Sequence, residues 1–192
     1  MSGRVRIGGV GPLHPPGRTG RNGAGSNWGR GRTAAAEEPA TVATMSATTD
    51  SETIDLVMIG GGNMGAALLG GMVNSGMFSP EQLAVVELRE ERRTELAELF
   101  PGITVTESIP PCRSAVLAVK PQGVAGAAAA AVAAGATRLL SIAAGVGIAT
   151  IEAAVGPNVA VVRCMPNTPA LVGMGTSAIA GGSAAHDDDL VW

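Results

Sequence analysis

The sequence predicts an α/β protein with a doubly wound, mostly parallel sheet. Two observations indicate this fold. Residues 54–59 and 114–119 are short runs with the nearly continuous apolar character of strands that are buried on both faces. Segments with helical spacing alternate with such runs along most of the chain, which is the order that a parallel sheet with crossover helices requires.

The individual elements follow from the same patterns. After the strand 54–59 comes a glycine-rich turn, and apolar residues then recur at helical spacing until Gly76 ends the helix. A stretch rich in Glu and Arg has the pattern of an amphipathic helix that runs to Phe100. We expect further strands at 83–86, 103–105, 138–142, 159–162 and 176–180, further helices at 123–134 and 148–155, and an irregular connection over 108–113.

The first part of the 192-residue chain differs in composition from the rest. Residues 1–44 carry six arginines against two glutamates, a net charge of +4, whereas the remainder carries −7. This segment is rich in Gly, Pro and Arg and has no apolar periodicity, so it buries too little surface to offset its ordering entropy. We therefore expect a disordered extension over 1–50 and a folded domain over 51–182. An RNA-binding tail or a targeting peptide is conceivable, but an extension upstream of a native start at Met45 is the preferred interpretation.

The glycine-rich turn lies between a predicted strand and a predicted helix. One glycine permits the tight turn, a second lets the backbone approach a pyrophosphate, and a third lets helix and strand pack closely. The helix N-terminus adds free N–H groups and partial positive charge. A glycine turn that binds nothing is the alternative. The position of the glycine-rich turn between strand and helix predicts a Rossmann dinucleotide-binding turn made of Gly60, Gly61, Gly62, Asn63, Met64 and Gly65.

Glu87 ends the second predicted strand, twenty-two positions after Gly65. A Rossmann unit places an acid near this position to bind the ribose 2′-hydroxyl of NAD, and a carboxylate there repels the 2′-phosphate of NADP. Arg89, Arg92 and Arg93 follow at once, however, and a guanidinium could neutralise that phosphate. The choice between NADH and NADPH thus stays open. A solvated helix face is the alternative for this charge cluster.

Lys120 is the only lysine of the chain, which has twelve arginines. It follows the apolar strand 114–119, and ligands of open α/β sheets bind outside the carboxyl ends of such strands. This position suits a contact with a cofactor, whereas a solvated loop lysine is the alternative.

Composition excludes several other classes. The chain has no Tyr, two Phe and two Trp, so it lacks the stacking platforms of a single-stranded nucleic-acid binder. Two cysteines and two histidines cannot form a disulfide framework, a zinc site or a catalytic triad, so we expect no metal and a reducing cytosol. No run approaches the roughly 18 apolar residues of a membrane span. We expect a soluble, cytoplasmic protein with no nucleic-acid or membrane partner.

Four motifs in order resemble the pyrroline-5-carboxylate reductase family, from about residue 54 to residue 182. They are the glycine turn 59–65, Ala-Val-Lys-Pro-Gln at 118–122, Ser-Ile-Ala-Ala-Gly-Val at 141–146 and Arg-Cys-Met-Pro-Asn-Thr-Pro at 163–169. The resemblance implies reduction of the cyclic imine 1-pyrroline-5-carboxylate to L-proline by hydride transfer from NADPH or NADH. It also implies that Asn167 and Lys120 act near the nicotinamide and substrate, with the nicotinamide side formed by Ala118, Val119, Lys120, Pro121, Ala143 and Ala144. Ser108 corresponds approximately to a cofactor-contacting Asn of the family.

Members of the family continue into a helical domain that dimerises and contributes to the substrate site. We therefore expect residues 183–192 to be the start of such a domain, the intact enzyme to be a homo-oligomer, and these 192 residues alone to bind the dinucleotide but to turn over the imine poorly. Two alternatives remain: another Rossmann-fold dehydrogenase, such as a 3-hydroxyacid or prephenate-type enzyme, and a non-catalytic nucleotide-binding module.

Overall fold

The computed structural model describes residues 5–9, 53–167, 169 and 174–191. The disordered extension expected over 1–50 lies outside the described residues, apart from Val5–Gly9, which form the short strand β1. The sequence patterns did not indicate this strand.

The described chain alternates strands and helices in the predicted order. The strands after β1 are β2 (Ile54–Ile59), β3 (Leu83–Val86), β4 (Thr104–Thr106), β5 (Cys112–Leu117), β6 (Arg138–Ser141), β7 (Ala160–Pro166) and β8 (Thr176–Gly181). The α-helices are α1 (Asn63–Asn74), α2 (Glu90–Leu99), α3 (Val124–Ala133), α4 (Ile148–Val155) and α5 (Asp187–Val191), and two short 3₁₀ helices are η1 (Pro80–Gln82) and η2 (Pro121–Gly123).

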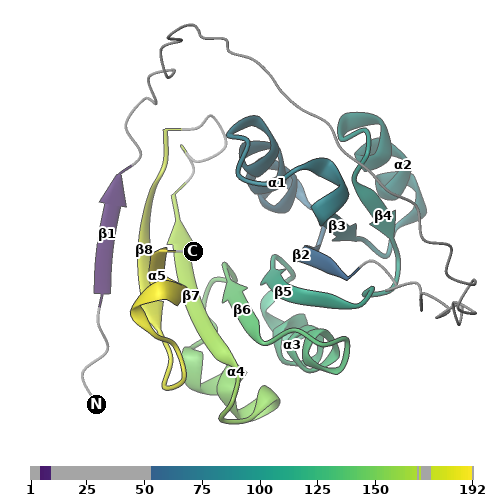
Figure 1. Ribbon diagram of the computed structural model, residues 1–192. Coiled ribbons are helices and arrows are strands. Elements are labelled where there is room, and N and C mark those ends of the chain that lie inside the picture. The colour runs from purple at the N-terminus through teal and green to yellow at the C-terminus, as the bar shows by residue number, and fades with distance from the viewer. Residues whose placement is uncertain (1–4, 10–52, 168, 170–173, 192) are drawn as a thin grey trace, which may run out of the picture. The chain divides into compact units, whose positions relative to one another are not determined.

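All of the described strands form one sheet in the order β1-β8-β7-β6-β5-β2-β3-β4 (Figure 1). The six strands from β2 to β7 run parallel, whereas β8 pairs antiparallel with both β7 and β1. The chain starts this parallel sheet at β2, builds outward to β4, and then crosses back to β5 on the other side of β2. The predicted fold class, a doubly wound and mostly parallel sheet, is confirmed.

Helices cover both faces of the sheet, with α1 and α2 on one side and α3 and α4 on the other (Figure 1). Successive side chains of β2 point to opposite faces of the sheet. Val57 and Ile59 pack with residues of α3 and α4, and Leu56 and Met58 pack with Leu69 of α1 and neighbouring groups. Because both faces are buried there, the central strands β2, β3 and β5 have nearly continuous apolar sequences rather than alternating ones.

Several boundaries differ from those that the sequence predicts. β5 begins at Cys112, inside the expected irregular connection over 108–113, because Cys112 pairs with Ile54 and extends the ladder. β7 continues through Pro166, beyond the expected end at 162, because the antiparallel strand β8 pairs with it as far as Pro166 and Ser177. β4 lies one residue later than expected, at Thr104–Thr106.

The end of the described chain is attached to the sheet by an ion pair. In α5, the buried Asp189 accepts a hydrogen bond from Arg138 Nε at 2.6 Å. Within the residues that the structure describes, no helix has the length and apolar character that crossing a membrane requires.

Candidate functional site

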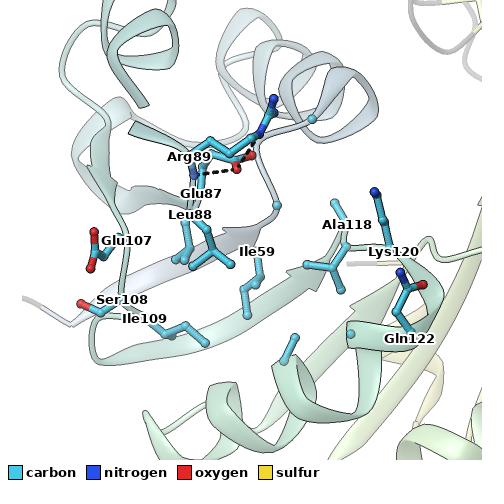
Figure 2. Close-up of a pocket in the computed structure, with 16 residues that line it drawn as sticks. Ile59, Glu87, Leu88, Arg89, Glu107, Ser108, Ile109, Ala118, Lys120 and Gln122 are labelled. Atoms are coloured by element: carbon cyan, nitrogen blue, oxygen red, sulfur yellow. Dashed lines mark hydrogen bonds and ion pairs between the residues drawn. The ribbon is translucent and has the colours of Figure 1, made fainter. Parts of the chain in front are cut away.

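A cavity of about 920 Å³ opens at the carboxyl ends of β2, β3 and β5 (Figure 2). From β2 the chain adds strands on one side as far as β4, and it then adds β5 on the other side of β2. The cavity therefore lies at the topological switch point of the sheet, which is where open α/β sheets bind ligands. The cavity is lined by Ile59, Gly60, Gly62, Val86, Glu87, Leu88, Arg89, Glu107, Ser108, Ile109, Ala118, Val119, Lys120, Gln122, Gly123 and Ala127.

The glycines of the turn each meet a distinct steric requirement. Gly60 has a φ of +108°, in the region that favours glycine, and a Cβ there would collide with the carbonyl group of Ala118. A Cβ on Gly65 would collide with the carbonyl oxygen of Gly60, so α1 and β2 come together as the sequence predicts. Gly62 has no neighbour within 4 Å of an added Cβ and lines the cavity. The backbone at Gly62 is thus accessible to a ligand.

Helix α1 begins directly at this turn. Its N-cap residue is Gly62, which has no side chain to satisfy the first N–H groups, and the first turn of α1 contains no acidic residue. The free N–H groups and the positive end of the helix dipole therefore favour an anion at this position.

Glu87 lies where β3 ends, with its side chain 11% exposed. Its Oε1 accepts hydrogen bonds from the backbone N–H of Arg89 at 3.1 Å and from Arg89 Nε at 3.3 Å. Burial acts to raise the pKa of Glu87, but the hydrogen bonds and charge of Arg89 and an N–H of Gly61 outweigh it, so the pKa lies below its ordinary value. The carboxyl group is therefore ionised at neutral pH.

The three arginines after Glu87 are held in different ways. Arg89 lines the cavity, and its side chain is 67% exposed. Arg92 and Arg93 are not among the lining residues, and their side chains are only 17% and 22% exposed. Both make hydrogen bonds to backbone carbonyl oxygens near the cavity.

The opposite side of the cavity is formed by the segment after β5. Ala118 continues the ladder, with its N–H donating to the carbonyl oxygen of Ile59 at 2.8 Å. Lys120 is exposed and precedes η2, and Figure 2 shows Lys120 and Gln122 across the cavity from Glu107 and Ser108. The cavity is therefore bounded by the segments at the ends of four strands, β2, β3, β4 and β5, together with residues of η2 and α3.

The structure brings together some of the predicted site residues and not others. Gly60, Gly62, Glu87, Ala118, Val119 and Lys120 line the cavity, as does Ser108. Gly61, Asn63, Met64, Gly65, Pro121, Ala143, Ala144 and Asn167 are not among the lining residues.

Two of the residues outside the cavity make hydrogen bonds of their own. Ala143 is buried, and its N–H donates to Ser141 Oγ at 3.4 Å. The Asn167 side-chain oxygen accepts a hydrogen bond from the Thr176 N–H at 3.0 Å, and the Asn167 N–H donates to the Thr176 carbonyl oxygen at 3.2 Å. Asn167 thus holds the ends of β7 and β8 together, and its role beside a substrate stays a prediction.

Sequence reasoning missed the apolar walls of the cavity. Leu88 is 80% exposed although it lies at the cavity, and Ile109 and Ala127 come from the loop after β4 and from α3. A signal for Leu88 was present, because it lies between Glu87 and Arg89, which the sequence places near the ribose. Nothing in the local sequence singles out Ile109 or Ala127, since only the fold brings them to this place.

Comparisons with known proteins agree with this geometry. Residues 55–145 match the family model described as NADP oxidoreductase, coenzyme F420-dependent. The pyrroline-5-carboxylate reductase of Synechocystis sp. is 37% identical over 143 residues, which are 71% of this chain and 52% of the relative. That of Pseudomonas aeruginosa is 38% identical over 130 residues, 65% of this chain and 47% of the relative. The chain spans about half the length of these curated relatives.

Solved structures give the same relationship. A pyrroline-5-carboxylate reductase from Coxiella burnetii is similar with a TM-score of 0.63 and 26% identity, over 71% of this chain and 52% of that one. The Plasmodium falciparum pyrroline carboxylate reductase with NADP bound has a TM-score of 0.59 and 27% identity, and the match covers 72% of this chain and 52% of that chain. The resemblance seen in the four sequence motifs is therefore confirmed.

Proposed function

We propose that this chain, which belongs with the pyrroline-5-carboxylate reductases over the region that they share, is the NAD(P)H-binding part of an enzyme that reduces 1-pyrroline-5-carboxylate to L-proline. The observation that carries this proposal is the cavity at the switch point. It joins the glycine turn, the acid at the end of β3 and the Ala118–Lys120 segment in one site, as a dinucleotide requires.

The residues present fit a dinucleotide from end to end. The backbone at Gly62 and the uncapped start of α1 would hold the pyrophosphate. Glu87 and Arg89 would face the adenosine ribose, with Leu88 and Ile109 as apolar neighbours for the base. The volume of about 920 Å³ is at the upper end of ordinary ligand sites, which suits a ligand of this size.

Both NADPH and NADH are compatible with this site. The Glu87 carboxylate favours the free ribose 2′-hydroxyl of NADH, and the exposed Arg89 is able to reach a 2′-phosphate. The relative from Plasmodium falciparum was solved with NADP. We propose NADPH or NADH as the cofactor.

The far end of the site would hold the nicotinamide. There Ala118, Val119 and Lys120, which line the cavity, would provide a surface on which the flat ring can lie. Pro121, Ala143 and Ala144, which lie outside the cavity lining, are proposed to complete the nicotinamide side. The bound cofactor supplies the hydride, so the protein must mainly position the two reactants and favour the protonated imine. We propose that Lys120 and Asn167 lie closest to that reaction. We also propose that the enzyme assembles into a homo-oligomer and is located in the cytoplasm.

Titrating NADPH and NADH by fluorescence, followed by an assay of 1-pyrroline-5-carboxylate reduction on the same sample, tests the proposal. We expect saturable binding of at least one dinucleotide, and L-proline formation that is slow with this chain alone, because misplacing the imine by an ångström costs on the order of a hundredfold in rate. Absence of dinucleotide binding would overturn the proposal. Binding without any detectable proline formation would favour a non-catalytic module. Reduction of a different substrate would favour another dehydrogenase.

A further inference from the structure

Helix α2 turns Arg92 toward the glycine turn rather than toward solvent. Arg92 Nε donates a hydrogen bond of 2.8 Å to the carbonyl oxygen of Gly61, and its Nη1 pairs with Glu95 Oε2 at 2.6 Å. With the Arg92 side chain only 17% exposed, the guanidinium is held between the turn and its own helix. The side chain therefore connects α2 to the segment proposed to bind the pyrophosphate.

The peptide groups of Gly61 are restrained on both sides. Glu87 lies beside Gly61 on one side, where the Gly61 N–H contributes to lowering the Glu87 pKa, and on the other side Arg92 donates a hydrogen bond to the Gly61 carbonyl oxygen. A Cβ on Gly61 would collide with Leu96 of α2, so the turn rests directly on that helix. In a planar trans peptide the N–H points opposite to the C=O. Fixing the Gly61 carbonyl toward Arg92 therefore directs the Gly62 N–H away from the Arg92 guanidinium, and Gly62 itself lines the cavity.

Arg93 holds the adjoining turn in a similar way. Its Nη1 donates to the carbonyl oxygens of Glu87 at 3.0 Å and Leu88 at 2.8 Å, and its Nη2 pairs with Glu107 Oε2 at 3.3 Å. One side chain thus joins the turn after β3 to the segment after β4. Glu87, Leu88 and Glu107 all line the cavity, so Arg93 fixes two of its walls relative to each other.

We propose that Arg92 and Arg93 are positioning residues, which hold the glycine turn and the ribose-side turn in the geometry that binds a dinucleotide without touching it. This inference rests on the proposed function. If Arg92 and Arg93 hold the turns, neither of them binds a 2′-phosphate, and Arg89 is the arginine that binds this group. The inference predicts that removing either guanidinium weakens the binding of NADH and NADPH by the same factor, because both dinucleotides bind to the turns that these side chains hold.

Arg92→Met and Arg93→Met in the full chain test the inference, with Arg113→Met as the matched control. Arg113 pairs with Asp55 at 3.2 Å near the starts of β5 and β2, at the opposite end of the sheet from the cavity. Dissociation constants are measured for NADH, NADPH and adenosine 2′-monophosphate, which lacks the pyrophosphate. Melting temperatures are recorded for every variant.

For Arg92→Met we expect both dinucleotides to bind about tenfold or more weakly, by equal factors, because a hydrogen bond from a charged donor is removed. Adenosine 2′-monophosphate should bind as in the wild type within about twofold, and Arg92→Lys, which retains a donor, should recover most of the affinity. Arg93→Met should weaken the binding of all three ligands, and Arg113→Met that of none.

Several outcomes would overturn the inference. A loss of affinity confined to NADPH would make the substituted arginine a 2′-phosphate ligand. Unchanged affinities would show that the turns keep their geometry without the guanidinium groups. Weaker binding of all three ligands in Arg92→Met, with a melting temperature well below that of Arg113→Met, would assign Arg92 a general role in stability. If the wild-type chain binds neither dinucleotide, the proposed function fails first and this inference fails with it.

Discussion

Glu87 and Arg89 form a local pair at the mouth of the cavity, in which one carboxylate oxygen accepts hydrogen bonds from both the backbone N–H and the Nε of Arg89, at 3.1 and 3.3 Å. An acid suited to a ribose 2′-hydroxyl and a cation suited to a 2′-phosphate thus lie side by side, two residues apart. The balance between them should set the cofactor preference.

Replacing Glu87 by Gln should move that preference toward NADPH. The change removes the negative charge that repels a 2′-phosphate and keeps an acceptor for the neighbouring donors. We expect the ratio of NADPH to NADH affinity to rise by at least about tenfold, or about 1.4 kcal/mol. Arg89→Met should lower the same ratio. If fluorescence titration gives the wild-type ratio for both variants, neither side chain faces the 2′ position.

The lowered pKa of Glu87 predicts how binding depends on pH. A depressed pKa means that the carboxylate remains ionised below the ordinary range of glutamate, and that its contribution disappears as the pH falls through the lowered value. The affinity of the wild type for NAD⁺ should therefore exceed that of Glu87→Gln from neutral pH to below the ordinary glutamate pKa. Calorimetric titrations of both proteins over this range check the prediction. An advantage that already disappears at or above the ordinary value would contradict it.

Gly62→Val should abolish dinucleotide binding while the protein stays folded. Gly62 has a φ of −65° and no neighbour within 4 Å of an added Cβ, so a side chain is tolerated by the protein but occupies the space proposed for the pyrophosphate. Gly71→Val is the control, since Gly71 lies in the helix that Gly62 caps and also has no neighbour within 4 Å. Equal affinities for NADPH in the two variants would show that the pyrophosphate does not bind beside Gly62.

Gly60→Ala and Gly126→Ala should change stability in opposite directions. Alanine at 60 would have to adopt a φ of +108° and would collide with the Ala118 carbonyl, which should cost about 1–3 kcal/mol or more. Gly126 lies within α3 with open space around it, so alanine there should stabilise by about 0.5–1 kcal/mol. Urea unfolding of both variants measures this difference. A Gly60→Ala protein as stable as the wild type would show that the turn relaxes without the positive φ.

Much of the fold is encoded in local patterns. The predicted helix 148–155 matches α4 at both ends, and the strand 54–59 matches β2. The positive φ of Gly60 and the close packing at Gly65 follow from a strand that must turn at once into a helix. Glu87 and Lys120 could be identified because each follows an apolar strand, and parallel strands place such residues at one edge of the sheet.

The remaining features depend on interactions between distant segments. β7 extends to Pro166 because β8 pairs with it, and no local pattern encodes an antiparallel partner ten residues away. The cluster of arginines after Glu87 predicts charge near the ribose, but it does not show which guanidinium points where. In the folded chain Arg92 and Arg93 reach backbone carbonyls of neighbouring turns, and Arg89 remains exposed.

The sequence by itself therefore determined the order of the elements, the glycine turn and the residues at the strand ends, because these depend on backbone sterics and on the periodicity of apolar side chains. Only the tertiary structure decided which side chains share the cavity and which hold its walls. Those roles depend on hydrogen bonds between segments that are far apart in the chain, such as Arg92 to Gly61 across 31 positions, and their geometry exists only once the sheet has formed.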